Sequence, residues 1–221
     1  MTNGETERVP ELPLEVRTLA RAPCPSHKEA MASAIDELGW HRAAHAVASP
    51  NCDVRPLDTT VSLIVVHNIS LPPGEFGTGA IKALFCNALD TTAHPYFEAL
   101  DGLRVSAHFL IDRRGDLTQF VSCEHRAWHA GRSSWAGRSK CNDLSVGIEL
   151  EGTDTLPYEC AQYDTLIRVI RDLRERYPSL RAGAIVGHSD IAPGRKTDPG
   201  PAFRWDRLRS DLRREAEGAP N

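Results

Sequence analysis

The sequence predicts an α/β fold, a single domain in which a central mixed β-sheet is flanked by helices. Three segments carry this prediction: an unbroken apolar run at residues 62–67, an alternating strand at residues 144–151, and an amphipathic helix at residues 158–177 that leads into a second apolar run. A strand, a helix and a further strand in this order form a right-handed crossover. The strands at the two ends of the helix are therefore expected to be parallel.

The composition is that of an ordinary globular protein. The chain has 221 residues, of which 41% are hydrophobic and 25% are charged, so it is long enough to bury one good core. Its formal net charge of -4 disfavours a nucleic-acid partner, because a general nucleic-acid binder normally carries a basic surplus. We expect an N-terminal extension at residues 1–34, one domain at residues 35–213 and a C-terminal tail at residues 214–221.

Cysteine spacing and the N-terminus indicate the compartment. The closest pair of cysteines, Cys123 and Cys141, is too far apart for the Cys-X-X-Cys spacing of a structural zinc site. The N-terminal region lacks the apolar core of an export signal, and no run is long and apolar enough to suggest a membrane partner. We therefore expect a cytoplasmic monomer with reduced thiols.

Residues 62–67, SLIVVH, form the first predicted strand. Their β-branched side chains do not alternate with polar ones, which is typical of a strand covered on both faces in the middle of a sheet. His67 falls at the carboxyl end of this strand. The Gly- and Pro-rich stretch at residues 68–100, with a short helix around Ile81 and Leu84, is expected to form the wall of a binding site.

A hairpin and a loop follow. Residues 105–112 and 116–122 are predicted to pair around Arg113-Arg114-Gly115, with Gly115 in the left-handed conformation. Residues 123–142 are predicted to be a loop. Trp128 in this polar loop suits stacking on a sugar ring as well as it suits covering the core.

The alternating strand LSVGIELE at residues 144–151 places apolar side chains on one side and Ser, Gly and Glu on the other. If the apolar side meets the helices, Glu149 and Glu151 point across the opposite face. The helix at residues 158–177 then leads into an apolar strand at residues 184–186. A rigid, irregular loop, GHSDIAPGRKTDPG, follows that strand.

The candidate site combines residues from these strand ends and this loop. His67, Glu149 and His188 all lie at the carboxyl ends of predicted strands, the edge at which α/β sheets carry their sites. Two imidazoles and the carboxylate of Asp198, with an open fourth position, would form a hydrolytic zinc site. Glu149 would take a proton from an activated water, and Lys196 would place its charge beside an oxyanion.

Simpler interpretations exist for each residue. A single strand-end histidine is more often a hydrogen-bonded core residue than a ligand, and the joint placement with Asp198 is what favours a metal site. Glu151 is the rival of Glu149 as the base. His108, within a strand, and His129, in the tryptophan loop, rank lower as ligands because neither combines a strand end with a rigid loop.

Several motifs resemble the N-acetylmuramoyl-L-alanine amidase family, which includes peptidoglycan-recycling amidases, phage-lysozyme-type amidases and peptidoglycan recognition proteins. The motifs are VVHNISLPPGEF, LRVSAHFLIDRRG, RAWHAG, LSVGIELEGTD and GHSDIAPGRKTDPGP. The resemblance implies the amidase fold, zinc ligands at His67, His188 and Asp198, and catalytic roles for Glu149 and Lys196.

The resemblance also implies a muropeptide substrate. The bond cut would be the amide between the lactyl group of anhydro-N-acetylmuramic acid, or N-acetylmuramic acid, and L-alanine, in cytosolic peptidoglycan recycling. Implied substrate contacts are Asn68, Arg104 and Trp128. Lys140 stands where an arginine is expected in the groove and would hold a carboxylate as a point charge.

Two other functions remain open. A non-catalytic peptidoglycan-binding module on the same fold is expected to lack one metal ligand, and an autolysin acting on intact cell wall is expected to carry an export signal.

Overall fold

The structure is a computed structural model that describes Met1 and residues 33–180 and 184–216. Residues 33–221 form one compact unit, and the fold is that of the described part of this unit. The expected extension at residues 1–34 lies almost wholly outside the described residues and stays a prediction.

The core of the unit is a six-stranded sheet with the strand order β1-β5-β4-β9-β3-β10. Its strands are β1 (His45–Ala46), β3 (Leu63–Ile69), β4 (Phe109–Ile111), β5 (Leu117–Gln119), β9 (Ser145–Glu151) and β10 (Ile185–Gly187). Only the pair β4 and β5 is antiparallel, and the other neighbouring strands of this sheet are parallel. The mixed sheet and the hairpin are confirmed, with Gly115 at a φ of 84°.

Two small sheets were not predicted. One pairs β2 (Cys52–Val54) with β6 (His125–Ala127), and the other pairs β7 (Ser134–Trp135) with β8 (Arg138–Ser139). The prediction that residues 123–142 form a loop was therefore wrong for β6, β7 and β8. Strands of two or three residues are too short to show a period of two, so pairing with a distant segment decides them.

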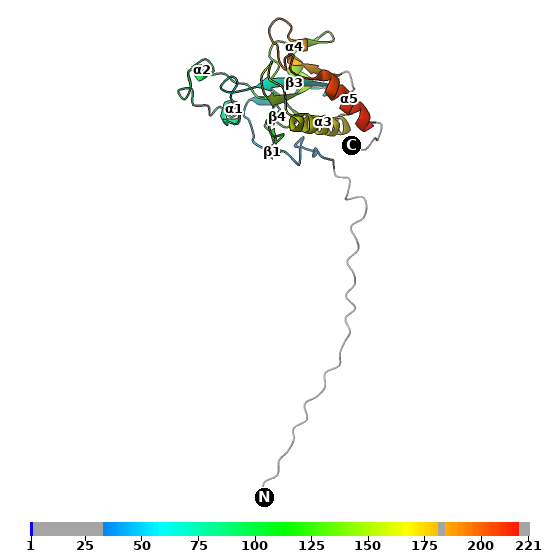
Figure 1. Ribbon diagram of the computed structural model, residues 1–221. Helices are drawn as coiled ribbons and strands as arrows, with labels where there is room; N and C mark the ends of the chain where they lie inside the picture. Colours follow the sequence, from blue (N-terminus) through cyan, green and yellow to red (C-terminus); the bar gives the residue numbers. More distant parts are fainter. Residues whose placement is uncertain (2–32, 181–183, 217–221) are drawn as a thin grey trace. The chain divides into compact units, whose positions relative to one another are not determined.

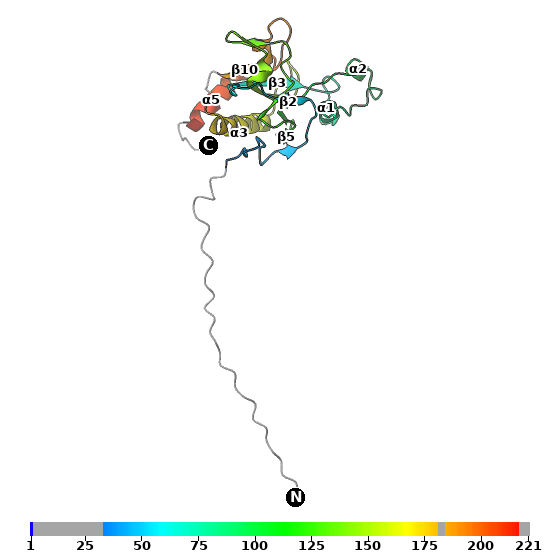
Figure 2. The ribbon, with the colours of Figure 1, turned by 180° about the vertical axis from the view of Figure 1, so that it is seen from behind.

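The described helices are α1 (Ala80–Phe85), α2 (Pro95–Glu98), α3 (Cys160–Arg176), α4 (His188–Ile191) and α5 (Trp205–Ala216), with a 3₁₀ turn, η2 (Cys141–Asp143). α1 and α3 confirm predicted helices. α5 was missed, and its last residues overlap the C-terminal tail that was expected at residues 214–221. Figures 1 and 2 show α1 and α2 at the end of the sheet away from α5.

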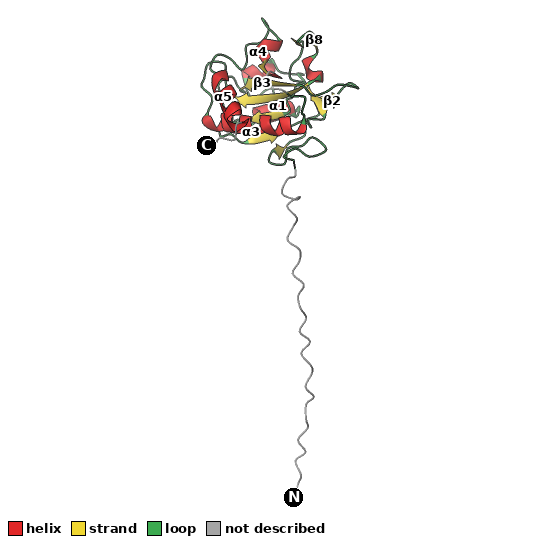
Figure 3. Ribbon diagram, turned by 90° about the vertical axis from the view of Figure 1, so that its right-hand side faces the viewer, coloured by secondary structure: helices red, strands yellow, loops and turns green. Residues whose placement is uncertain are grey.

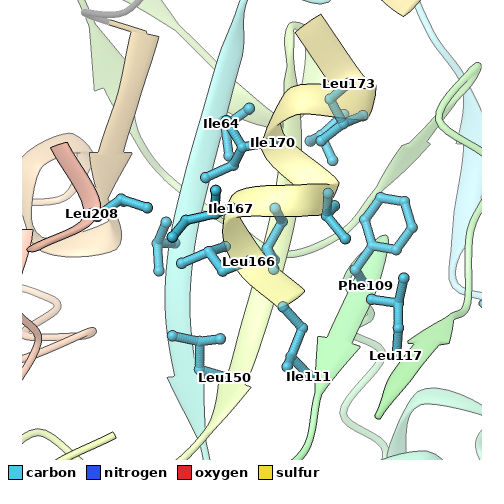
Figure 4. Close-up of a cluster of buried hydrophobic side chains, with 14 of the residues drawn as sticks. Ile64, Phe109, Ile111, Leu117, Leu150, Leu166, Ile167, Ile170, Leu173 and Leu208 are labelled. Carbon is cyan, nitrogen blue, oxygen red and sulfur yellow. The ribbon is translucent and has the colours of Figure 1, made fainter. Parts of the chain in front are cut away.

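α3 covers one face of the sheet. Figure 4 shows Ile170 of α3 beside Ile64 of β3. Leu166 of α3 belongs to the same cluster, and all three side chains are fully buried. Burial of each such side chain stabilises the fold by about 1.5–3 kcal/mol. The predicted alternation is confirmed for β9, because Val146, Ile148 and Leu150 belong to this same cluster. Leu144, which ends η2 before β9 begins, belongs to another cluster.

The other face of the sheet carries polar side chains. Leu63 and Val65 of β3 pack in a separate cluster away from α3, and by alternation His67 follows them on that face. Ser145, Gly147, Glu149 and Glu151 occupy the same face of β9. Figures 1 and 3 show α3 and α4 on opposite sides of β3. The site is built on the α4 side.

The connection between α3 and β10 completes the predicted crossover. β9 and β10 both pair in parallel with β3, which lies between them. The sequence had suggested that an irregular loop directly follows β10, but a short helix comes first. This helix is α4, in which the Asp190 carboxylate accepts the Gly187 N–H at 2.7 Å and so satisfies a free donor at the helix start. Among the described helices, none is long and apolar enough to span a bilayer.

Candidate active site and metal centre

His67 and Glu149 are direct register partners on the parallel strands β3 and β9. Neighbouring strands lie about 4.8 Å apart, so the two side chains leave the sheet side by side on the same face. Both are buried, with 1% of His67 and 8% of Glu149 exposed. The sequence had suggested that His67 is at the end of its strand. β3 continues to Ile69, so His67 lies inside the strand.

His188 and Asp198 reach this position from the next strand. β10 pairs with β3, and its last residue, Gly187, leads directly into His188 at the start of α4. The loop after α4 folds back because the Ser189 N–H donates to the Asp198 carbonyl oxygen at 3.0 Å. This bond brings the Asp198 side chain beside His188.

The three predicted ligands converge. His67 Nδ1 and His188 Nδ1 are 2.9 Å apart, and Asp198 Oδ2 is 3.1 Å from each nitrogen. No other group of three metal-binding side chains meets this spacing within the described residues. The structure therefore brings together, around one point, the residues that the sequence singled out from positions far apart along the chain.

The donor set fits a divalent cation. Burial lowers the pKa of His67 to about 4, so the imidazole is neutral at pH 7 and keeps one unprotonated nitrogen that can bind a metal. Two imidazole nitrogens and one carboxylate oxygen form the donor set of hydrolytic zinc sites.

Glu149 lies beside these donors, in the same cavity. Burial, and to a lesser extent the charge of Asp198, raises its pKa well above the usual value, while the charge of Lys196 opposes this shift. Within the described part of the chain, Glu149 Oε2 is buried without a hydrogen-bond partner. This oxygen can therefore accept a hydrogen bond from a bound molecule without giving up a contact within the described part of the chain.

Glu151 has a different role. Its Oε1 accepts the Gly77 N–H at 2.6 Å, and its Oε2 accepts the Arg113 N–H at 3.3 Å. Both partners of the Glu151 carboxylate are thus backbone N–H groups. The carboxylate joins the loop before α1 to the hairpin between β4 and β5, so its oxygens are already occupied.

A cavity of about 430 Å³ opens over the cluster. The cavity is lined by the three metal-ligand candidates, Glu149 and Lys196, and also by apolar side chains, among them Leu84, Phe85, Leu100 and Leu103. The expectation that residues 68–100 wall the site is confirmed. A polar reacting end joined to an apolar wall is typical of an enzyme pocket for a small ligand.

Comparison with known proteins agrees with this geometry. The family model described as N-acetylmuramoyl-L-alanine amidase matches residues 57–201. This chain belongs to the N-acetylmuramoyl-L-alanine amidase family. It is an amidase, and the match includes every residue of the candidate site.

Relatives of this amidase cover most of its length. The 1,6-anhydro-N-acetylmuramyl-L-alanine amidase AmpD of Citrobacter freundii is 57% identical over 176 residues, which are 80% of this chain and 93% of the relative. A crystal structure of a selenomethionine AmpD derivative has a TM-score of 0.77 at 56% identity and covers 80% of this chain and 97% of that one. The Escherichia coli amidase AmiD, in complex with anhydro-N-acetylmuramic acid-L-Ala-D-gamma-Glu-L-Lys, has a TM-score of 0.51 at 26% identity and covers 85% and 66% of the two chains.

The expected substrate contacts of the amidase divide into two groups. Asn68 and Trp128 line the cavity, and Asn68 Nδ2 donates to Asp154 Oδ1 at 2.8 Å. Arg104 is exposed between two lining residues, Leu103 and Val105. Lys140 is exposed beside the β7 and β8 hairpin and does not line the cavity.

The two lower-ranked histidines do not join the cluster of His67, His188 and Asp198. His108 Nδ1 accepts the Gly147 N–H at 3.0 Å, so this ring is part of the sheet's packing. His129 Nδ1 lies 2.9 Å from the Nε2 atom of His67, on the side away from the cluster. The sequence carried no signal for this contact, because the residues that orient His129 come from a different part of the chain.

Proposed function

We propose that this chain is a zinc-dependent amidase of cytosolic peptidoglycan recycling. It cuts the amide between the lactyl group of 1,6-anhydro-N-acetylmuramic acid and the L-alanine of the stem peptide. The convergence of His67, His188 and Asp198 beside the unpartnered Glu149 carboxyl group carries this proposal. Support for the anhydro sugar comes from the name of the AmpD relative and from the ligand in the AmiD complex.

His67 Nδ1, His188 Nδ1 and a carboxylate oxygen of Asp198 would hold the zinc ion. A zinc ion bound there supplies a Lewis acid for the scissile carbonyl and an attacking water. The remaining chemistry belongs to the chain's own side chains.

Glu149 takes a proton from the attacking water as the new bond to the carbonyl carbon forms. Its raised pKa makes it a stronger base than an exposed glutamate, and the buried Oε2 has no competing partner. The protonated carboxyl group then gives this proton to the amide nitrogen, and the C–N bond breaks to release the L-alanine amine.

Lys196 stabilises the oxygen of the tetrahedral intermediate. Its side chain lines the reacting end of the cavity, and its backbone N–H donates to the Ala192 carbonyl at 3.1 Å, which fixes the turn that carries it. A positive charge already in place where negative charge develops lowers the barrier without reorganisation during the reaction.

Substrate contacts are proposed for Asn68, Trp128 and Arg104. Asn68 keeps its amide oxygen for a peptide N–H, since its Nδ2 is held by Asp154. Trp128 offers a ring in the cavity for the sugar, and Arg104 offers an exposed guanidinium for a carboxylate of the stem peptide. Lys140 is left out of the proposed contacts because it does not line the cavity.

The test is a competition between anhydro-muramoyl and intact muramoyl tripeptides in one reaction with purified full-length chain, with the released sugars separated by mass spectrometry. We expect release of both sugars, with faster release of the anhydro sugar. Glu149→Ala is the matched inactive control. Equal rates would overturn the anhydro preference, and tight binding without turnover would instead favour the peptidoglycan-binding module.

A digestion of intact sacculi in parallel examines the autolysin alternative. We expect little release of stem peptides from sacculi relative to soluble muropeptides. Release from sacculi at the soluble rate would assign the chain to intact cell wall instead of recycling.

A further inference from the structure

Two consecutive residues contact the outer nitrogens of both histidines in the metal-ligand cluster. The Nε2 atom of His67 lies 2.9 Å from His129 Nδ1, and the Nε2 atom of His188 lies 3.2 Å from the Ala130 carbonyl oxygen. The Nδ1 atoms of His67 and His188 face the cluster. A neutral imidazole carries its hydrogen on only one nitrogen. Each ring therefore offers a lone pair to a metal in the cluster only if its hydrogen is on Nε2.

The direction of the bond at His188 is fixed by its partner. A carbonyl oxygen only accepts, so His188 Nε2 carries the hydrogen and donates it to Ala130. His188 Nδ1 is then an unprotonated acceptor that faces the cluster.

The direction at His67 follows from a longer series of contacts. The Ser145 hydroxyl donates to the Cys141 carbonyl at 2.6 Å, so its oxygen accepts from His129 Nε2 at 3.1 Å. The reverse order would leave two oxygens 2.6 Å apart with no hydrogen between them. Since His129 Nε2 carries a hydrogen, His129 Nδ1 accepts from His67 Nε2, and His67 Nδ1 keeps its lone pair.

The segment that makes these contacts is itself held in place. Asn142 Oδ1 accepts the backbone N–H of His129 at 3.2 Å and that of Ala130 at 2.8 Å. The His129 ring lies against Gly147 so closely that a Cβ added there would be 2.5 Å from His129 Cγ. The ring is confined between the backbone of β9 and its own loop.

We propose that His129 is a positioning residue for the metal centre: it accepts the Nε2 hydrogen of His67 and so holds His67 Nδ1 unprotonated and aimed at the metal. This inference rests on the proposed zinc amidase function. Outer contacts of this type typically change metal affinity by about 10–100-fold.

The test compares His129→Asn with His129→Leu in the full chain. The two new side chains have nearly the same shape, and both lose the contact with Ser145. Only Asn places an oxygen near the position of His129 Nδ1, where it accepts from His67. His45→Leu, at an exposed position on β1, controls for an added leucine.

The readout is the dissociation constant of Zn²⁺, measured by competition with a chromophoric chelator, together with the melting temperature of each chelator-stripped chain. We expect His129→Leu to bind zinc about 10–100-fold more weakly than wild type. His129→Asn should recover most of this loss, with similar melting temperatures for the two stripped variants. Equal zinc affinity in His129→Leu and wild type, or equal loss in the Leu and Asn variants, would overturn the proposal. Failure of the wild-type chain to bind zinc tightly would instead overturn the proposed function.

Discussion

His67 and Glu149 face each other across the β3 and β9 ladder, so a candidate metal ligand and a candidate base are held by two paired backbones. Both side chains leave the sheet on the face opposite α3. The hydrogen bonds of a parallel ladder fix their separation, and the buried α3 side of the sheet keeps the ladder from slipping. A one-residue slip of either strand would turn its own side chain, His67 or Glu149, toward the hydrophobic core.

The first prediction concerns the metal ligands. His67→Ala, His188→Ala and Asp198→Ala should each remove the bound zinc and the amidase activity, because each deletes one of three converging donors. Metal analysis of the purified chains measures zinc per protein. The exposed His45→Ala variant serves as the control. Full zinc occupancy in Asp198→Ala would move the third ligand to another residue.

The second prediction separates the two glutamates of β9. Glu149→Ala should keep its zinc and lose about 10²- to 10⁴-fold in kcat, the usual contribution of a positioned general base. Glu151→Ala should lower kcat far less. It should mainly raise KM or lower the stability of the fold, because Glu151 binds the backbone N–H groups of Gly77 and Arg113. Steady-state rates with parallel zinc analysis make the comparison. The reverse order would reassign the base to Glu151.

The third prediction concerns acid stability. Burial, and to a lesser extent the positive charge of Arg55, lowers the pKa of His108 to about 3. The pKa of a histidine in an unfolded chain is about 6.5. The unfolded chain thus binds a proton that the folded chain does not. Stability is therefore lost as the pH falls below about 6.5, by about 1.4 kcal/mol per pH unit for one such group, until about pH 3.

Urea unfolding of the zinc-stripped chain between pH 7 and 5 measures this slope. His108→Gln should give a slope shallower by about one proton, and the exposed His45→Gln should leave it unchanged. A wild-type slope in His108→Gln would show that His108 does not titrate as described.

The fourth prediction concerns the N-terminal segment. Deleting residues 1–30 should leave kcat unchanged and the melting temperature within a few degrees, because the segment has few apolar residues and precedes the family match at residue 57. For a domain of this size, about 1 kcal/mol shifts the melting temperature by roughly 2 to 4 °C. A larger drop in a thermal melt would show that the segment contributes to stability.

The parts of the fold that the sequence predicted are those with local patterns. β3 is a long β-branched run, β9 alternates over its whole length, and α3 has an apolar stripe, so each shows its own periodicity. The parallel pairing of these strands with β10 then followed from chain order. This was enough to place His67 and Glu149 near the same edge.

The parts that were missed depend on distant partners. The short strands β2 and β6 exist because Cys52 and Ala127 pair across a long separation in sequence. α5 carries so many charges that its few buried residues, such as Leu208, did not stand out. The orientation of His129 depends on Ser145 and Cys141, and no pattern around His129 itself contains that information.

The Glu151 carboxylate has a consequence for how the substrate cavity can change over evolution. By binding the Gly77 N–H, it fastens the near part of the wall to the same strand that carries Glu149. The segment between Gly77 and Leu103 supplies apolar side chains to the cavity wall, and its first residue is held in place by this hydrogen bond. Insertions or deletions in this segment can reshape its part of the cavity wall for a different sugar or peptide while the spacing between Glu149 and His67 stays constant. Substrate range and catalytic power are thus separable traits in this fold.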